Sequence, residues 1–165
     1  MPRRKEIKNL ANSELFSVQI YDEYQAADSF TEDAIFEKWA AVEVNDIDNV
    51  PEGMESHSLS GGKYAVFIHK GTWSAFYQTS QYIFGTWLPE SEFELDDREH
   101  FEIMGEKYFG PDDPNSEEEV WVPIRWDMKK LFKILGYGFA GVVVILILVY
   151  LFFYIKWHLS TSANM

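Results

Sequence analysis

The sequence contains no cysteine. This absence excludes disulfide bridges, thiolate metal sites and cysteine nucleophiles. Basic residues are also scarce, because 14 Lys and Arg stand against 27 Asp and Glu, giving a formal net charge of −13 at pH 7. Nucleic-acid binding depends on clustered Lys and Arg that neutralise phosphates. The composition therefore argues against a nucleic-acid partner.

Several catalytic signatures are missing as well. We find no Ser/His/Asp order, glycine-rich phosphate loop or metal-ligand cluster in the sequence. The acidic segment 111–119, PDDPNSEEE, lacks the spacing of a calcium-binding loop, so we expect a solvated run of charge. We therefore expect no cofactor and no metal, and a binding protein rather than an enzyme.

Aromatic residues, in contrast, are abundant: they make up 17% of the 165 residues and include six Trp. Such a content indicates either a thick aromatic core or an aromatic-lined pocket. The length without a membrane span is about 130 residues, which is enough for one soluble domain with a core of ordinary size.

One long apolar run lies near the C-terminus. Residues 134–155 carry no charge, and about 22 residues at 1.5 Å each give roughly 33 Å of helix, enough to cross a bilayer. Arg125, Lys129, Lys130 and Lys133 precede the run and Lys156 follows it, so the positive-inside bias places the N-terminal domain in the cytoplasm. We predict a cytoplasmic domain at 1–128, a basic juxtamembrane segment at 129–133, a transmembrane helix at 134–155 and a short tail at 156–165 on the opposite side.

The soluble part shows an α+β pattern. Alternation predicts half-buried strands at 17–24 and 34–44, and further strands at 100–105 and 119–124, the last with Pro123 marking an edge or a strand end. Residues 62–71, GKYAVFIHKG, are apolar on both faces and predict a central strand. Helical spacing from Trp73 to Trp87 predicts an aromatic helix face, and residues 1–10 are expected to form the end of a helix. The order predicts a duplicated β-α-β-β unit whose first copy lacks its opening strand.

Four separated segments carry a family resemblance: GGKYAVFIHKG, YIFGTWLPES, HFE and EEEVWVPIR. Together they resemble the GyrI-like small-molecule-binding domain, the effector-binding domain of AraC-type regulators, over about residues 3–125. The resemblance implies two β-α-β-β halves in pseudo-twofold arrangement, with helices on the outer face of a curved sheet and a ligand cleft between the halves. It also implies a missing first strand, for which we expect either an upstream extension or a strand from a partner. No helix-turn-helix region accompanies the domain.

The resemblance and the strand patterns together give five candidate ligand-binding residues. Glu102, in HFE, matches a family position at which an acidic residue receives cationic aromatic ligands. Glu37 and Trp39 share a strand face, so the carboxylate is expected to line the same cleft as the indole. Tyr64 and Trp121 are expected to form cleft wall or core. His69 is expected to be structural.

Three functional hypotheses follow. The first is a membrane-anchored sensor or sequestering protein whose partners are a small hydrophobic or cationic ligand and the lipid bilayer. The second is an accessory subunit that docks through an unpaired sheet edge onto subunits of a membrane complex or onto a second copy; Gly136 and Ala140 form a small-xxx-small pair that favours helix association. The third, implied by some relatives, is hydrolysis of strained electrophilic compounds by a Trp and Glu pair. An open cleft favours the first hypothesis and a filled cleft the second.

Overall fold

The computed structural model describes residues 3–21 and 36–162. The chain divides into two compact units, Met1–Arg125 and Trp126–Met165, which are described separately. The strands of the first unit are β1 (Leu15–Tyr21), β2 (Phe36–Ala41), β3 (Tyr64–Lys70), β4 (Phe93–Leu95), β5 (His100–Met104) and β6 (Glu117–Trp126), the last of which ends one residue beyond the unit. Its helical turns are η1 (Arg4–Glu6), η2 (Trp73–Ala75), α1 (Phe76–Tyr82), the π-helical η3 (Ile83–Trp87) and α2 (Leu88–Glu90).

The strands form one six-stranded sheet in the order β2-β1-β5-β6-β3, with β4 paired to β6. Each neighbouring pair along this order is antiparallel. The predicted α+β class is therefore confirmed. The prediction that 62–71 is a central strand is wrong, because β3 ends the strand order and Val66 and Ile68 on one of its faces are 45% and 61% exposed.

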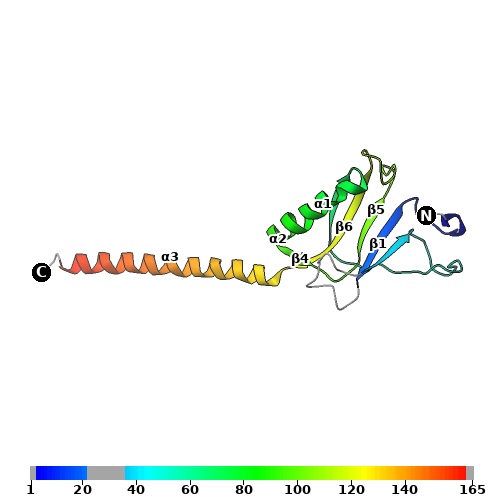
Figure 1. The fold of residues 1–165 in the computed structure, drawn as a ribbon. Coiled ribbons are helices and arrows are strands. Elements are labelled where there is room, and N and C mark those ends of the chain that lie inside the picture. Colours follow the sequence, from blue (N-terminus) through cyan, green and yellow to red (C-terminus); the bar gives the residue numbers. More distant parts are fainter. Residues whose placement is uncertain (1–2, 22–35, 163–165) are drawn as a thin grey trace. The chain divides into compact units, whose positions relative to one another are not determined.

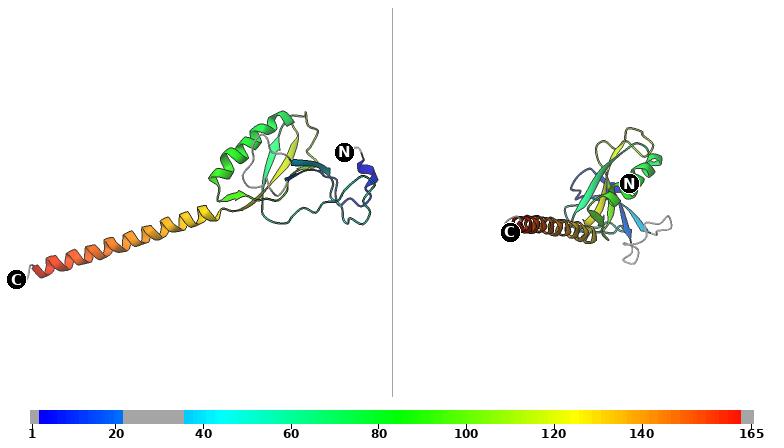
Figure 2. Two further views of the ribbon diagram at one scale, coloured as in Figure 1. Left: turned by 60° about the horizontal axis from the view of Figure 1, so that its bottom comes forward. Right: turned by 90° about the vertical axis from the view of Figure 1, so that its left-hand side faces the viewer.

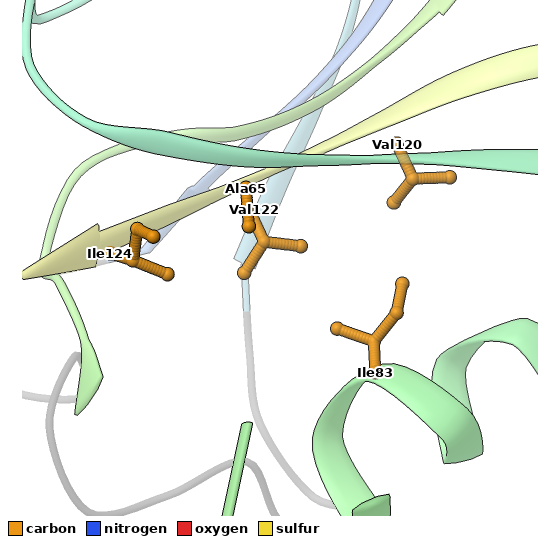
Figure 3. Packing of buried hydrophobic residues seen from close by; sticks show 5 residues of the cluster. All are labelled: Ala65, Ile83, Val120, Val122 and Ile124. Carbon is orange, nitrogen blue, oxygen red and sulfur yellow. The ribbon is translucent and has the colours of Figure 1, made fainter. Parts of the chain in front are cut away.

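The helical segment 73–90 covers one face of the sheet (Figures 1 and 2). In Figure 3, Ile83 of η3 points toward the strand residues Ala65, Val120, Val122 and Ile124, and these five buried side chains form the core cluster. The predicted aromatic helix face is correct only in part. Phe76, Phe84 and Trp87 pack against the core, whereas Trp73 and Tyr77 are 60% and 67% exposed.

Pro123 lies well inside β6, between two neighbouring strands. The backbone N–H of Ile124 donates to Lys63 on the β3 side, so the nitrogen of Pro123 points to the other side. The ladder with β5 ends at Trp121 on that side, and the carbonyl of Pro123 accepts a hydrogen bond from the N–H of Asp96. The missing donor of proline therefore costs the sheet no hydrogen bond with β5.

The first residues pair with the chain that follows β2. Of residues 3–10, only Arg4–Glu6 is helical, so within this range the predicted helix end is shorter than expected. An isolated bridge joins Leu10 to Val44, and the amides of Ala11 and Asn45 donate to Glu43 and Asn9. Figures 1 and 2 show the N-terminal segment and the loop after β2 side by side at one end of the sheet. Of the predicted strands 17–24 and 34–44, residues 22–24 and 34–35 lie outside the described residues.

The second unit contains one long helix, α3 (Met128–Ser162), of 35 residues. Its stretch Met128–Phe152 is apolar and long enough, by length and composition, to cross a membrane. At 1.5 Å per residue this 25-residue stretch gives roughly 37 Å of helix.

Candidate ligand-binding site

A groove of about 920 Å³ lies on the face of the sheet opposite the helical segment. Side chains alternate between the two faces of a strand, so residues in register with one another share a face. Trp39 faces Val18, Val18 faces Phe101, and Phe101 faces Trp121, which places one continuous row across β2, β1, β5 and β6. All four residues line the groove and form its floor.

The β5 and β6 end of this floor is aromatic. The rings of Phe101 and Trp121 are stacked, with centroids 5.3 Å apart and planes 17° apart. Tyr64 adds a third ring, 5.3 Å from Phe101 and 5.8 Å from Trp121, although it is not itself a lining residue. The three rings make this end of the groove apolar and aromatic, a lining that suits a flat hydrophobic ligand.

Each tryptophan of the floor donates a hydrogen bond to a glutamate two residues earlier on its own strand face. Trp39 Nε1 donates to Glu37 Oε2 at 3.1 Å, and Trp121 Nε1 donates to Glu119 Oε2 at 2.8 Å. The indole N–H groups are thereby satisfied without a ligand, and each carboxylate is held beside an aromatic ring. The two Glu-x-Trp segments come from the first and the second part of the domain.

The loop after β2 forms the opposite wall of the groove, with lining residues from Asp46 to Leu59. Hydrogen bonds hold both ends of this loop. At the near end the amide of Asn9 donates to the carbonyl and the carboxylate of Asp46, and at the far end Tyr64 donates its hydroxyl to Ser60. The sequence predicted a loop here but not its role as a wall.

The charge of the lining is negative. Among the described residues, those lining the groove include no Lys or Arg, but they include five carboxylates: Glu14, Glu37, Glu43, Asp46 and Glu55. Carboxylates beside ring faces in a partly water-excluded groove attract cations by Coulomb force and by the ring quadrupole.

Of the five predicted site residues, Glu37, Trp39 and Trp121 line the groove, and Tyr64 supports its floor. Glu102 lies on the other face, because it is in register with the core residue Val120. It is 7% exposed, and its two carboxylate oxygens accept hydrogen bonds from Gln19 Nε2 at 2.7 and 2.9 Å. The structure therefore does not bring Glu102 together with the other four.

The helix-covered face around Glu102 carries a second set of polar groups. Burial raises the pKa of Glu118, and the nearby charge of Glu102 raises it further. His69 is buried, and its Nδ1 lies 2.8 Å from Thr79 Oγ1, in keeping with the structural role expected for it. Lys38 places its ammonium 4.8 Å from the ring centroid of Trp73. A cavity of about 20 Å³ is lined by Glu118 and His69.

The acidic segment 111–119 is partly neutralised by lysines. Glu117 accepts from Lys70 at 3.1 Å and from Lys107 at 2.9 Å, and these hydrogen bonds lower the pKa of the Glu117 carboxyl. Within the described part of the chain, no group of three or more His, Cys, Asp or Glu side chains is arranged to hold a metal ion.

Sequence reasoning missed one lining residue with a titratable ring, His57. It lies in a segment without periodicity, and its partners come from β2 and from the segment before β5. No local pattern marks such a residue, because its position depends on how the loop folds back over the sheet.

Comparison with known proteins identifies the domain. Residues 3–125 match the family model described as the GyrI-like small molecule binding domain. The transcriptional regulator BrlR of Pseudomonas aeruginosa is 38% identical over 85 residues, a match that covers 52% of this chain and 32% of BrlR. The chain thus matches about a third of the length of that relative. Since the family model spans residues 3–125 of the 165, the chain belongs to the GyrI-like small-molecule-binding domain family.

Proposed function

We propose that the groove binds an amphipathic, cationic small molecule, and that α3 anchors the domain to a membrane with the domain in the cytoplasm. The protein then acts as a sensor or a sequestering protein. The observation that carries the proposal is the lining itself: a floor of Trp39, Phe101 and Trp121 with five carboxylates and, among the described residues, no Lys or Arg.

The energetics favour a cation over a neutral ligand of the same shape. A cation over a tryptophan face gains roughly 0.5–2 kcal/mol, depending on how far it is desolvated. Glu37 is exposed, so its charge is screened and contributes less than a buried carboxylate does. The ring faces therefore supply most of the affinity, and the carboxylates supply the preference for positive charge.

The test is fluorescence titration of the full chain, in detergent micelles, with the planar aromatic cation ethidium. Trp39→Ala should weaken binding about twofold to thirtyfold, because it removes a cation–π face. Trp39→Phe keeps a ring and should weaken binding less. Glu37→Gln should weaken ethidium binding by roughly threefold and leave 6-phenylphenanthridine, a neutral relative of ethidium, almost unaffected.

Glu102→Gln is the matched control on the other face of the sheet. If the ligand occupies the groove, this variant should bind ethidium as the wild type does. Glu102 stays a predicted ligand contact for the helix-covered face: a loss of about tenfold or more in Glu102→Gln, with Glu37→Gln unchanged, would move the ligand to that face. If the wild type binds no hydrophobic cation, the proposed ligand-binding function is wrong.

A second candidate function is docking to a membrane protein complex. It is favoured by the edge strand β3, on which Val66 and Ile68 are exposed on the groove side of the sheet. An edge strand with exposed β-branched side chains is a template for pairing with another chain. The volume of the groove supports the ligand-binding function over docking, since a groove of about 920 Å³ is within the range of small-molecule sites.

A further inference from the structure

His57 occupies the end of the groove next to Trp39. Its ring meets the indole of Trp39 edge-on, with centroids 5.7 Å apart and planes 61° apart, and it lines the groove. On its other side, Nε2 lies 2.7 Å from Glu99 Oε1. The imidazole is therefore held between the aromatic floor and a carboxylate, with its side chain 31% exposed.

Glu99 is a fixed anion. Its side chain is 11% exposed, and its second oxygen accepts a hydrogen bond from the backbone N–H of Ser60 at 3.2 Å. Burial works to raise the pKa of Glu99, but the hydrogen bonds from its own backbone amide, from His57 and from Ser60 together hold the pKa below its usual value. Glu99 consequently remains ionised from mildly acidic to basic pH and anchors His57 in either protonation state.

The charge of this end of the groove depends on the imidazole. Histidine is the side chain whose ordinary titration falls between pH 5 and 8. The other charged groups on the segments around His57 include Glu37 on β2, Glu55 on its own loop, and Asp96, Asp97 and Arg98 on the segment before β5. Arg98 donates to Asp96 at 2.8 Å and stacks on Tyr64, and Arg125 lies 3.6 Å from the other oxygen of Asp96.

We propose that His57, positioned by Glu99, is a specificity-determining residue that makes the affinity of the groove for cations depend on pH. This inference rests on the proposed ligand-binding function of the groove. With a neutral imidazole the His57 and Glu99 pair carries one negative charge beside Trp39. Protonation of the imidazole cancels that charge. Cations therefore bind more tightly at high pH, whereas a neutral ligand of the same shape gains nothing from the change.

The experiment titrates the full chain in micelles with ethidium and with 6-phenylphenanthridine at pH 5.5 and pH 8. One unit of charge within several ångströms of the ligand, at the effective dielectric of a partly exposed site, changes the affinity by roughly threefold to tenfold. We expect ethidium to gain that factor at pH 8 and the neutral ligand to show less than a twofold change. A pH dependence shared equally by both ligands would mean that the loop moves on protonation, and it would overturn the inference.

His57→Gln and Glu99→Gln are the decisive variants. Glutamine at 57 keeps a donor for Glu99 but does not titrate, so His57→Gln should bind ethidium with the same affinity at pH 5.5 and pH 8. Loss of the imidazole ring beside Trp39 changes both affinities alike and leaves this comparison intact. Glu99→Gln removes the anion, so ethidium should bind more weakly at both pH values while the pH dependence remains. If His57→Gln keeps the wild-type pH profile, His57 is not the determinant, although the groove still binds cations. If ethidium binds at neither pH, the proposed function itself fails and this inference fails with it.

Discussion

At the scale of single residues, the buried imidazole of His100 makes the stability of the fold depend on pH. It is 7% exposed on β5, and burial lowers the pKa of its imidazole from 6.5 to about 4. The folded state therefore binds fewer protons than the unfolded state between these values. Stability contributed by the neutral ring is present above pH 6.5 and is lost as the pH falls from 6.5 toward 4; below that both states are protonated.

We accordingly predict that the free energy of unfolding of the full chain in micelles falls by about 3 kcal/mol between pH 6.5 and pH 4 on account of this one group. Urea denaturation followed by tryptophan fluorescence at several pH values measures it. His100→Gln is the matched variant, since it cannot titrate and its curve should be flatter by that amount. If the free energy of unfolding of the wild type and of His100→Gln depends on pH in the same way, the prediction is wrong, because His100 then takes up its proton in the folded state without a loss of stability.

Residue by residue, the sequence was informative where strand alternation decides the outcome. Glu37 and Trp39 were expected on one face from their spacing alone, and they line the groove together. The HFE motif predicts Glu102 as a ligand contact but carries no information on strand register, and the register with Val120 puts Glu102 on the helix-covered face. His57 and Glu99 are 42 residues apart, and no spacing rule connects them.

At the scale of elements, a glycine determines how the segment before β5 packs on β3. Gly62 has a φ of +151°, and a Cβ built there would lie 2.4 Å from the guanidinium nitrogen Nη1 of Arg98. Arg98 uses this space to stack on Tyr64 at 4.4 Å and to donate to the carbonyl of Lys63 at 2.6 Å. The close approach of Arg98 thus depends on a residue without a side chain.

Gly62→Ala should therefore displace Arg98 and destabilise the domain by roughly 1–3 kcal/mol, through backbone strain and loss of the hydrogen bonds of Arg98. The neighbouring Gly61→Ala is the control, because nothing lies within 4 Å of a Cβ at that position. Thermal unfolding should show a lower midpoint for Gly62→Ala and little change for Gly61→Ala. Equal midpoints would refute the dependence of this packing on Gly62.

Elements were predictable in proportion to their periodicity. Strands β2, β3 and β5 fall within segments whose alternation or apolar run indicates them, and β1 and β6 overlap such segments but extend beyond them. The three-residue β4 is too short to show a period, and the π-helical turn Ile83–Trp87 has the same apolar spacing as an α-helix. The order of the strands in the sheet is harder to predict than the strands themselves. The edge position of β3 depends on which distant segments pair with it, and the apolar pattern of 62–71 does not contain that information.

At the scale of the whole molecule, charge is unevenly distributed along the sequence. All 27 Asp and Glu precede residue 128, and the charged residues that follow are four lysines. Three of them, Lys129, Lys130 and Lys133, lie in the first two turns of α3. Under the positive-inside bias this arrangement favours retention of the N-terminal side in the cytoplasm.

The orientation can be measured because the chain contains no cysteine of its own. A cysteine appended after Met165 should react with a membrane-impermeant maleimide in intact bacterial cells. Glu106→Cys, on an exposed turn of the domain, should react only after lysis. Replacing Lys129, Lys130 and Lys133 together by glutamine leaves one basic residue near each end of the span, Arg125 and Lys156. A measurable fraction of the chains should then insert the other way and protect the appended cysteine. If Glu106→Cys is labelled in intact cells and a cysteine appended to the otherwise wild-type chain is protected, the N-terminal domain lies outside and the predicted orientation is wrong. Recovery of the chain in the soluble fraction would rule out a membrane span.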